Sequence, residues 1–171
     1  MGEVTLVGAL TGESVILRPI VTDDVPVLVH IMNTPEVRQW WDAADLVDTW
    51  PMPDGSSTRL TIVTGRRIAG MIQYWENEDP SDRHAGMEIF IDPDLHGRGL
   101  GRDAIRTLAR YLFDDLGHHR LVIDPAATNE TAIRCCAAVG FRPVGMMHGR
   151  ERHTSSVRDG MVMDLLSTEL R

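Results

Sequence analysis

The chain has 171 residues, of which 43% are hydrophobic and 25% are charged, a composition typical of one soluble domain. Its formal net charge of -8 argues against nucleic acid as a partner, because binding nucleic acid requires Lys and Arg to neutralise phosphates. No apolar run is long enough to span a membrane, and the N-terminal segment lacks the basic flank and apolar core of a signal peptide. We therefore expect one cytoplasmic domain over residues 1–171, with no membrane partner.

The first part of the chain predicts a strand, two helices and two strands, in the order of residues 14–20, 22–32, 33–42, 59–64 and 67–75. Thr22 or Asp23 is expected to cap the first helix, because short polar side chains accept hydrogen bonds from free amides there. Pro35 is suited to the first turn of the second helix. Gly65 and Arg66 are expected to join the two strands as a hairpin.

The second part predicts a strand, a helix, a strand, a helix and two closing strands, in the order of residues 86–92, 100–116, 120–124, 129–139, 141–147 and 160–166. Ile105, Leu108 and Leu112 recur at helical spacing and indicate the buried face of the longer helix. Asn129 is expected to cap the last helix, and Gly140 is expected to end it. The only cysteines, Cys135 and Cys136, are adjacent, which fits neither a disulfide framework nor a familiar zinc spacing, so we expect no metal.

Three glycines at alternate positions, Gly97, Gly99 and Gly101, lie between a predicted strand and the long helix that follows it. A glycine-rich turn at a helix N-terminus presents free backbone amides and the positive end of the dipole, which favours a phosphate or pyrophosphate. The dinucleotide-binding fingerprint fails because Arg102 stands where its third glycine belongs, and the Gly-Lys-Ser/Thr ending of a P-loop is absent. The alternative is a connector whose glycines serve only a tight turn.

The segment "HGRGLG" resembles the central motif of the GNAT (general N-acetyltransferase) superfamily: Gln or Arg, two residues, Gly, one residue, then Gly or Ala. His96, Gly99 and Gly101 stand at these places, and His96 departs from the usual Gln or Arg. The segment "DPAATNETAIRCCAAVGF" is similar to the family's Asp-Pro, Asn, Ala and Gly-Phe run. The resemblance implies an α/β (α+β) fold with a mixed, mostly antiparallel central sheet, parallel fourth and fifth strands, and flanking helices.

The resemblance also implies an acetyl-CoA-dependent enzyme. The pyrophosphate of CoA is expected on the amides of the glycine loop, and its pantetheine arm is expected to bond along the preceding strand like an added strand. The implied cofactor-binding residues are Ile89, Phe90, Ile91, His96, Gly97, Arg98, Gly99, Leu100, Gly101, Arg102 and Asn129.

Two segments indicate which molecule accepts the acetyl group. They are "LRPIVTDDVPVLVHIMNTPEVRQWW" and "IDPAATN", which look like the aminoglycoside 6′-N-acetyltransferases. The first segment also resembles ribosomal-protein N-terminal acetyltransferases. We expect a small cationic amine as substrate, specifically the 6′-amine of an aminoglycoside, because an acidic chain suits a polycation. The expected substrate-binding residues are Trp41, Trp75, Glu76, Glu88 and Asp124. The alternatives are an N-terminal protein acetyltransferase and a non-catalytic CoA-binding domain, as a monomer or a homodimer.

Glu88 and Asp124 are the candidate bases, because an ammonium must lose a proton before it attacks a thioester. Their strands are expected to splay, so that both carboxylates face one cleft. We prefer Asp124, which precedes Pro125 at a strand end, over the alternative that it only holds an Asx turn. The family commonly supplies a tyrosine acid seven places after the Asn. Cys136 stands there, as a candidate acid or as a small buried helix residue.

Overall fold

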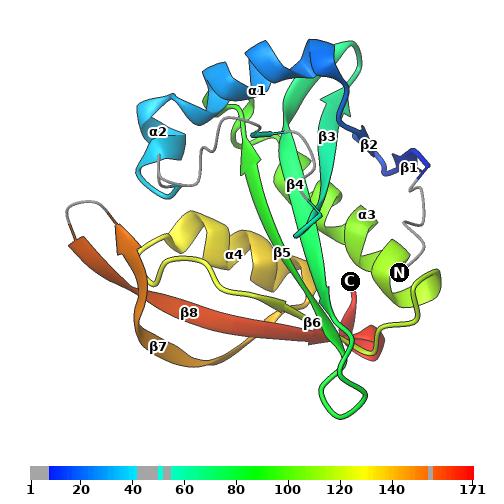
Figure 1. Ribbon diagram of the computed structural model, residues 1–171, viewed down its shortest axis with the longest axis vertical. Helices are drawn as coiled ribbons and strands as arrows, with labels where there is room; N and C mark the ends of the chain where they lie inside the picture. Colours follow the sequence, from blue (N-terminus) through cyan, green and yellow to red (C-terminus); the bar gives the residue numbers. More distant parts are fainter. Residues whose placement is uncertain (1–7, 42–49, 52–54, 154–155) are drawn as a thin grey trace.

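The computed structural model describes residues 8–41, 50–51, 55–153 and 156–171; residues 1–7, part of the segment assessed for a signal peptide, lie outside them. Eight strands in this described part form one sheet in the order β1-β2-β3-β4-β5-β6-β8-β7 (Figure 1). The strands are β1 (Leu10–Thr11), β2 (Ile16–Pro19), β3 (Thr58–Thr64), β4 (Arg67–Asn77), β5 (His84–Ile91), β6 (Arg120–Ile123), β7 (Arg142–His153) and β8 (Ser156–Leu166). The helices are α1 (Val25–Met32), α2 (Pro35–Arg38), α3 (Leu100–Asp114) and α4 (Glu130–Val139), with short 3-10 turns η1 (Thr22–Asp24), η3 (Pro93–Leu95) and η4 (Ser167–Glu169).

Strand pairing in the sheet is antiparallel except between β5 and β6, which run parallel. The mixed, mostly antiparallel sheet expected from the sequence is therefore confirmed, as is the β3–β4 hairpin through Gly65. β1 was not expected, because a strand of two residues is too short to show an alternating pattern. β7 and β8 extend beyond the expected 141–147 and 160–166, since their outer ends are largely polar and lack the apolar alternation of a buried strand.

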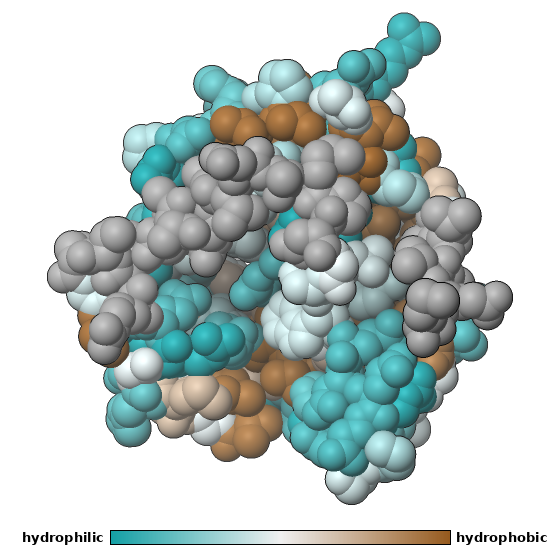
Figure 2. Space-filling view, viewed as in Figure 1, coloured by the Kyte–Doolittle hydropathy of each residue, from teal (hydrophilic) through white to brown (hydrophobic). Residues whose placement is uncertain are grey.

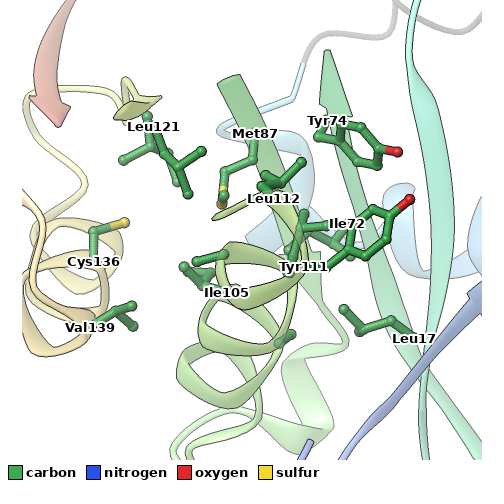
Figure 3. Packing of buried hydrophobic residues seen from close by; sticks show 14 of the residues in the cluster. Leu17, Ile72, Tyr74, Met87, Ile105, Tyr111, Leu112, Leu121, Cys136 and Val139 are labelled. Carbon is green, nitrogen blue, oxygen red and sulfur yellow. The ribbon is translucent and has the colours of Figure 1, made fainter. Parts of the chain in front are cut away.

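Helices lie on both faces of the sheet. α3 and α4 contribute to the larger apolar cluster, and α1 and α2 contribute to a smaller one on the other face. Side chains along β5 alternate between the faces, so Met87 belongs to the larger cluster and Phe90 to the smaller. Figure 3 shows Ile105 of α3 and Val139 of α4 lying near each other in the larger cluster. Among the described residues, no helix combines the length and apolar character needed to cross a bilayer.

The ends of α4 agree with the sequence. The Asn129 side chain accepts a hydrogen bond from the Ala132 amide at 3.2 Å, and Gly140 ends the helix with a φ of 119°. The start of α1 differs, because neither Thr22 nor Asp23 makes a capping hydrogen bond there. Helical structure instead begins at Thr22 as the turn η1, which ends at the buried Asp24.

Asp24 anchors the start of α1 to the sheet. Its two carboxylate oxygens accept hydrogen bonds from both terminal nitrogens of Arg18 in β2, at 2.6 and 2.8 Å. The carboxylate also accepts from Thr61 Oγ1 in β3 at 2.8 Å and from the Val21 amide at 3.0 Å. Asp24 is only 2% exposed, and the hydrogen bond from Arg18 lowers its pKa to about 2. These contacts explain why Asp24, rather than Thr22 or Asp23, determines the local structure.

We expect Asp24→Asn to destabilise the protein by about 3 kcal/mol at pH 7, because it leaves the Arg18 guanidinium without its counter-ion. The folded pKa lies below the ordinary 3.8, so the ionised carboxylate stabilises the fold above that pH. This contribution is lost as the pH falls from about 4 to about 2, and the difference between wild type and variant should shrink in that range. Urea unfolding at pH 7 and pH 3 measures it. Asp23→Asn, at an exposed neighbouring position, is the control, and an equal effect there would contradict the assignment.

Candidate active site

A cleft opens where β5 and β6 separate. The two strands pair only at Ala85 with Leu121 and at Gly86 with Val122, so beyond Gly86 this edge of β5 has no strand partner in the described chain. The cleft has a volume of about 410 Å³. Its walls come from the residues after α2, β5, the end of β6 and the turn after it, α3, α4 and the β7–β8 hairpin. The lining residues are Trp40, Trp41, Met87, Glu88, Ile89, Ile105, Ile123, Asp124, Pro125, Ala126, Asn129, Ala132, Cys135, Cys136, Arg150, Glu151 and Arg158.

The glycine loop leads from the end of β5 into α3. Gly97 and Gly99 have φ values of 76° and 77°, and a Cβ at either position would meet no protein atom within 4 Å. The first intrahelical bond of α3 runs from the Asp103 amide to the Gly99 carbonyl, so the amides of residues 100–102 have no acceptor within the helix. The loop therefore presents donors on an open surface, as an anion site requires.

His96, which departs from the motif, has a local structural role. Its Nε2 lies 2.8 Å from the carbonyl oxygen of Ile91. A carbonyl only accepts, so Nε2 carries the proton and donates it. The imidazole thus connects the start of the glycine loop to the end of β5, while the free amides belong to the backbone of the residues that follow.

The cleft brings together the two candidate bases. Asp124 follows β6, is 15% exposed at its side chain, and accepts a hydrogen bond from Arg150 Nε at 2.5 Å. Glu88 of β5 accepts a hydrogen bond from Gln73 Nε2 at 2.7 Å. Gln73 in turn accepts one from Arg59 Nε at 3.1 Å, which fixes the orientation of its amide. Neither Gln73 nor Arg150 was expected from the sequence, because both reach the carboxylates from other strands.

Aromatic side chains after α2 form one wall of the cleft. Trp41 lines it as expected and packs edge-on against Phe90, with ring centroids 5.3 Å apart. Trp40, which the sequence did not favour, lines it too and lies 5.7 Å from the Arg158 guanidinium carbon of β8. Arg158 Nη1 also donates to the Gln39 carbonyl, and Nη2 lies 3.2 Å from Glu151 Oε2. The β7–β8 hairpin is thereby attached to the residues after α2.

Trp75 and Glu76, expected at the substrate, do not line the cleft. Trp75 covers Gly86, where an added Cβ would lie 2.3 Å from the Trp75 ring. Oε2 of Glu76 lies 2.6 Å from Nε2 of the buried His118. Hydrophilic side chains cover the end of the β4–β5 hairpin that follows (Figure 2), and Asp82 in it pairs with Arg120 at 2.6 Å. The expected position of Glu76 is corrected: it lies opposite Ala85, where β5 and β6 are still paired, and its side chain contacts His118 instead of the cleft.

Cys136 lies within the larger apolar cluster, near Leu121 and Met87 (Figure 3). It is 2% exposed, and burial raises the pKa of its thiol to about 12. A thiol with this pKa is a much weaker acid than an ordinary one of about 8.5. The structure therefore favours the small buried residue over the proton donor. Burial also raises the pKa of Cys135, which is partly exposed.

The chain is similar to acetyltransferases in sequence and in fold. The sequence profile of a family described as "Acetyltransferase (GNAT) domain" matches residues 14–142. The chain is 26% identical over 157 residues to the aminoglycoside N(6′)-acetyltransferase type 1 of Klebsiella pneumoniae, covering 79% of this chain and 77% of that protein. It is 27% identical over 148 residues to the spermidine N(1)-acetyltransferase of Escherichia coli K12, covering 81% and 78%. A solved structure of AAC(6′)-Ib with paromomycin and acetyl-CoA superposes with a TM-score of 0.75 at 21% identity, covering 92% and 96%.

We expect the two cysteines to differ in reactivity. At pH 8 the native protein should react with iodoacetamide first at the partly exposed Cys135, while the buried Cys136 remains protonated and unmodified until the protein is unfolded. Mass spectrometry of peptides from native and urea-unfolded protein measures the two sites separately. Cys135→Ser is the control, since it should abolish the native-state reaction. Rapid native modification of Cys136 in that variant would contradict the assignment.

Proposed function

Since the chain belongs to the GNAT acetyltransferase family, we propose that it transfers an acetyl group from acetyl-CoA to the 6′-amine of an aminoglycoside. The observation that carries the acceptor is the gathering of three carboxylates, Glu88, Asp124 and Glu151, in one cleft beside the unpaired edge of β5. The same cleft is lined by two arginines, Arg150 and Arg158, so its charged side chains leave a net negative charge, which attracts and orients a polycation. The similarity to an aminoglycoside acetyltransferase supports the same acceptor class.

The acyl donor is acetyl-CoA, and the elements beside the cleft suit its parts. The glycine loop and the first turn of α3 offer free amides for the pyrophosphate. The edge of β5 beyond Gly86 offers backbone groups at Ile89, Phe90 and Ile91 for the pantetheine amides. Asn129 lines the cleft while its side chain caps α4. The thioester would then lie between β5 and Asp124.

In the acetyl transfer, the ammonium of the acceptor first gives one proton to Asp124. The neutral nitrogen attacks the thioester carbon, and the backbone amides of β5 stabilise the oxyanion. The intermediate then collapses: the C–S bond breaks, the nitrogen loses a second proton, and the CoA thiolate takes up one proton to leave as a thiol. Glu88, oriented by Gln73, binds the acceptor's positive charge. One proton is released overall. Burial raises the pKa of the Cys136 thiol, which argues against it as the proton donor.

A polyamine is the second candidate acceptor. The similarity to a spermidine acetyltransferase equals that to the aminoglycoside enzyme in extent, and an extended polyamine would also pair with several carboxylates. Trp40 and Trp41 favour the aminoglycoside over the polyamine. Aromatic faces attract the cationic groups of both, but only the aminoglycoside has sugar rings on which they can also stack. These tryptophans are the reason that we place the aminoglycoside first.

We expect Gly99→Ala to weaken CoA binding at least tenfold, because the new methyl group would project where the pyrophosphate must approach. Gly65→Ala is a matched control: Gly65 also has a positive φ, 58°, and open space around it, but it lies in the β3–β4 turn. Both variants should lose about 1 kcal/mol of stability from the same backbone strain. Calorimetric titration with CoA separates the two effects. Equal CoA affinities in the two variants would contradict the site.

We expect Asp124→Asn to reduce amine turnover by about 10² to 10⁴, the range for a lost acid-base group, with little loss of stability. Turnover of acetyl-CoA is measured with kanamycin, spermidine and a peptide with a free N-terminus. Glu88→Gln should mainly raise KM for the amine, and Glu78→Gln, on the exposed β4–β5 loop, should change neither constant.

The same panel decides between the acceptors. Kanamycin should give the highest kcat/KM, and preferred turnover of spermidine would transfer the assignment to polyamines. Efficient acetylation of the peptide alone would favour an N-terminal acetyltransferase. Tight CoA binding without turnover of any amine would identify a binding domain and overturn the proposal.

A further inference from the structure

The protein already holds a cation of its own on the carboxylate assigned to the acceptor. Arg150 Nε lies 2.5 Å from Asp124 Oδ2, within hydrogen-bond distance. Both side chains line the cleft, and that of Arg150 is 35% exposed, so it has room to move toward solvent. The Asp124 carboxylate could accept a further hydrogen bond, but an ammonium placed on it would lie beside the Arg150 guanidinium, and the two positive charges repel each other. An acceptor amine that binds Asp124 must therefore compete with Arg150.

An irregularity in the β7–β8 hairpin directs Arg150 into this position. The pairing runs from Met147 with Gly160 to Glu151 with Arg158, so residues 148–150 face a single residue, Asp159. The Asp159 carboxylate accepts a hydrogen bond from the Gly149 amide at 2.8 Å, and Gly149 has a φ of 62°. A bulge of this kind re-aims the side chain beside it.

The Arg150 side chain crosses β8 at Gly160, where the lack of a side chain leaves room for it. A Cβ at this position would lie 2.9 Å from Arg150 Cγ and 3.9 Å from the Asp124 carbonyl oxygen. The turn that holds Asp124 is itself bonded to β8, through the Met161 amide and the Pro125 carbonyl at 2.8 Å. The bulge, Gly160 and this bonded turn together place the guanidinium on Asp124.

We propose that Arg150 is a tethered competitor that occupies Asp124 when the cleft lacks an acceptor and is displaced by the ammonium that will react. This inference rests on the proposed function. If Arg150 occupies Asp124 nine-tenths of the time, every competing amine binds about tenfold more weakly. Only amines whose further ammonium groups reach Glu88 or Glu151 then retain useful affinity. Arg150 thereby sets a minimum affinity that polycations reach and simple amines do not, although it weakens the binding of every amine by the same factor.

The test compares Arg150→Gln and Arg150→Lys with wild type. Binding of kanamycin, spermidine and ethylamine to the CoA-saturated protein is measured by calorimetry, and KM and kcat are measured with acetyl-CoA. Arg150→Gln should lower Kd and KM for each amine about tenfold, leaving KM for acetyl-CoA unchanged. Arg150→Lys keeps the charge and should remain near wild type. Arg142→Gln removes an arginine from the same strand, outside the cleft, and should change nothing.

Unchanged or weaker amine binding in Arg150→Gln would overturn the inference, because Arg150 would then be a bystander or a substrate contact. If Arg150→Gln fails to fold, Gly160→Ala provides the second variant, since its methyl group displaces the Arg150 stem and should also strengthen amine binding. Absence of turnover in every variant, with the tenfold difference in binding retained, would overturn only the proposed acetyl transfer. Turnover with equal KM in wild type and Arg150→Gln would overturn only the role of Arg150.

Discussion

The parting of β5 from β6 after two residue pairs is the constraint on which the rest of the site depends. Parallel strands that stayed paired would satisfy the edge of β5 and leave no room beside it. Their separation frees backbone groups on β5, opens the cleft, and leaves Asp124 at the end of β6 facing that space. The same β5 continues into the glycine loop, so one strand links the two parts of the expected cofactor site.

The cleft is closed on its far side by elements distant in the sequence. Arg158 of β8 contacts the Gln39 carbonyl and the Trp40 ring, and it thereby attaches the β7–β8 hairpin to the segment after α2. That segment depends on α1, whose start is bonded through Asp24 to β2 and β3. The ion pair between Arg18 and the buried Asp24 thus holds the start of α1, the helix that precedes the segment with Trp40 and Trp41 along the chain.

Two of the carboxylates in the cleft are paired with arginines, so the cleft is not a bare acidic surface. Asp124 pairs with Arg150, and Glu151 pairs with Arg158. An acceptor must replace such contacts with its own, which favours ligands with several cationic groups in a suitable geometry. The formal net charge of -8 indicated a cationic partner, but it contained no information about this internal balance. The minimum affinity proposed above comes from the placement of Arg150, not from total charge.

The sequence alone determined the order of most elements, the glycine loop, and the ends of α4 at Asn129 and Gly140, because these depend on local hydrophobic periodicity and backbone preference. It also indicated that Glu88 and Asp124 belong to neighbouring strands. Only the tertiary structure decided which side chains meet those carboxylates, that Glu76 turns away from the cleft, and that Cys136 is buried in the core. These depend on strand register, on a bulge in β7 and on packing between distant elements, none of which is encoded in a short stretch of residues.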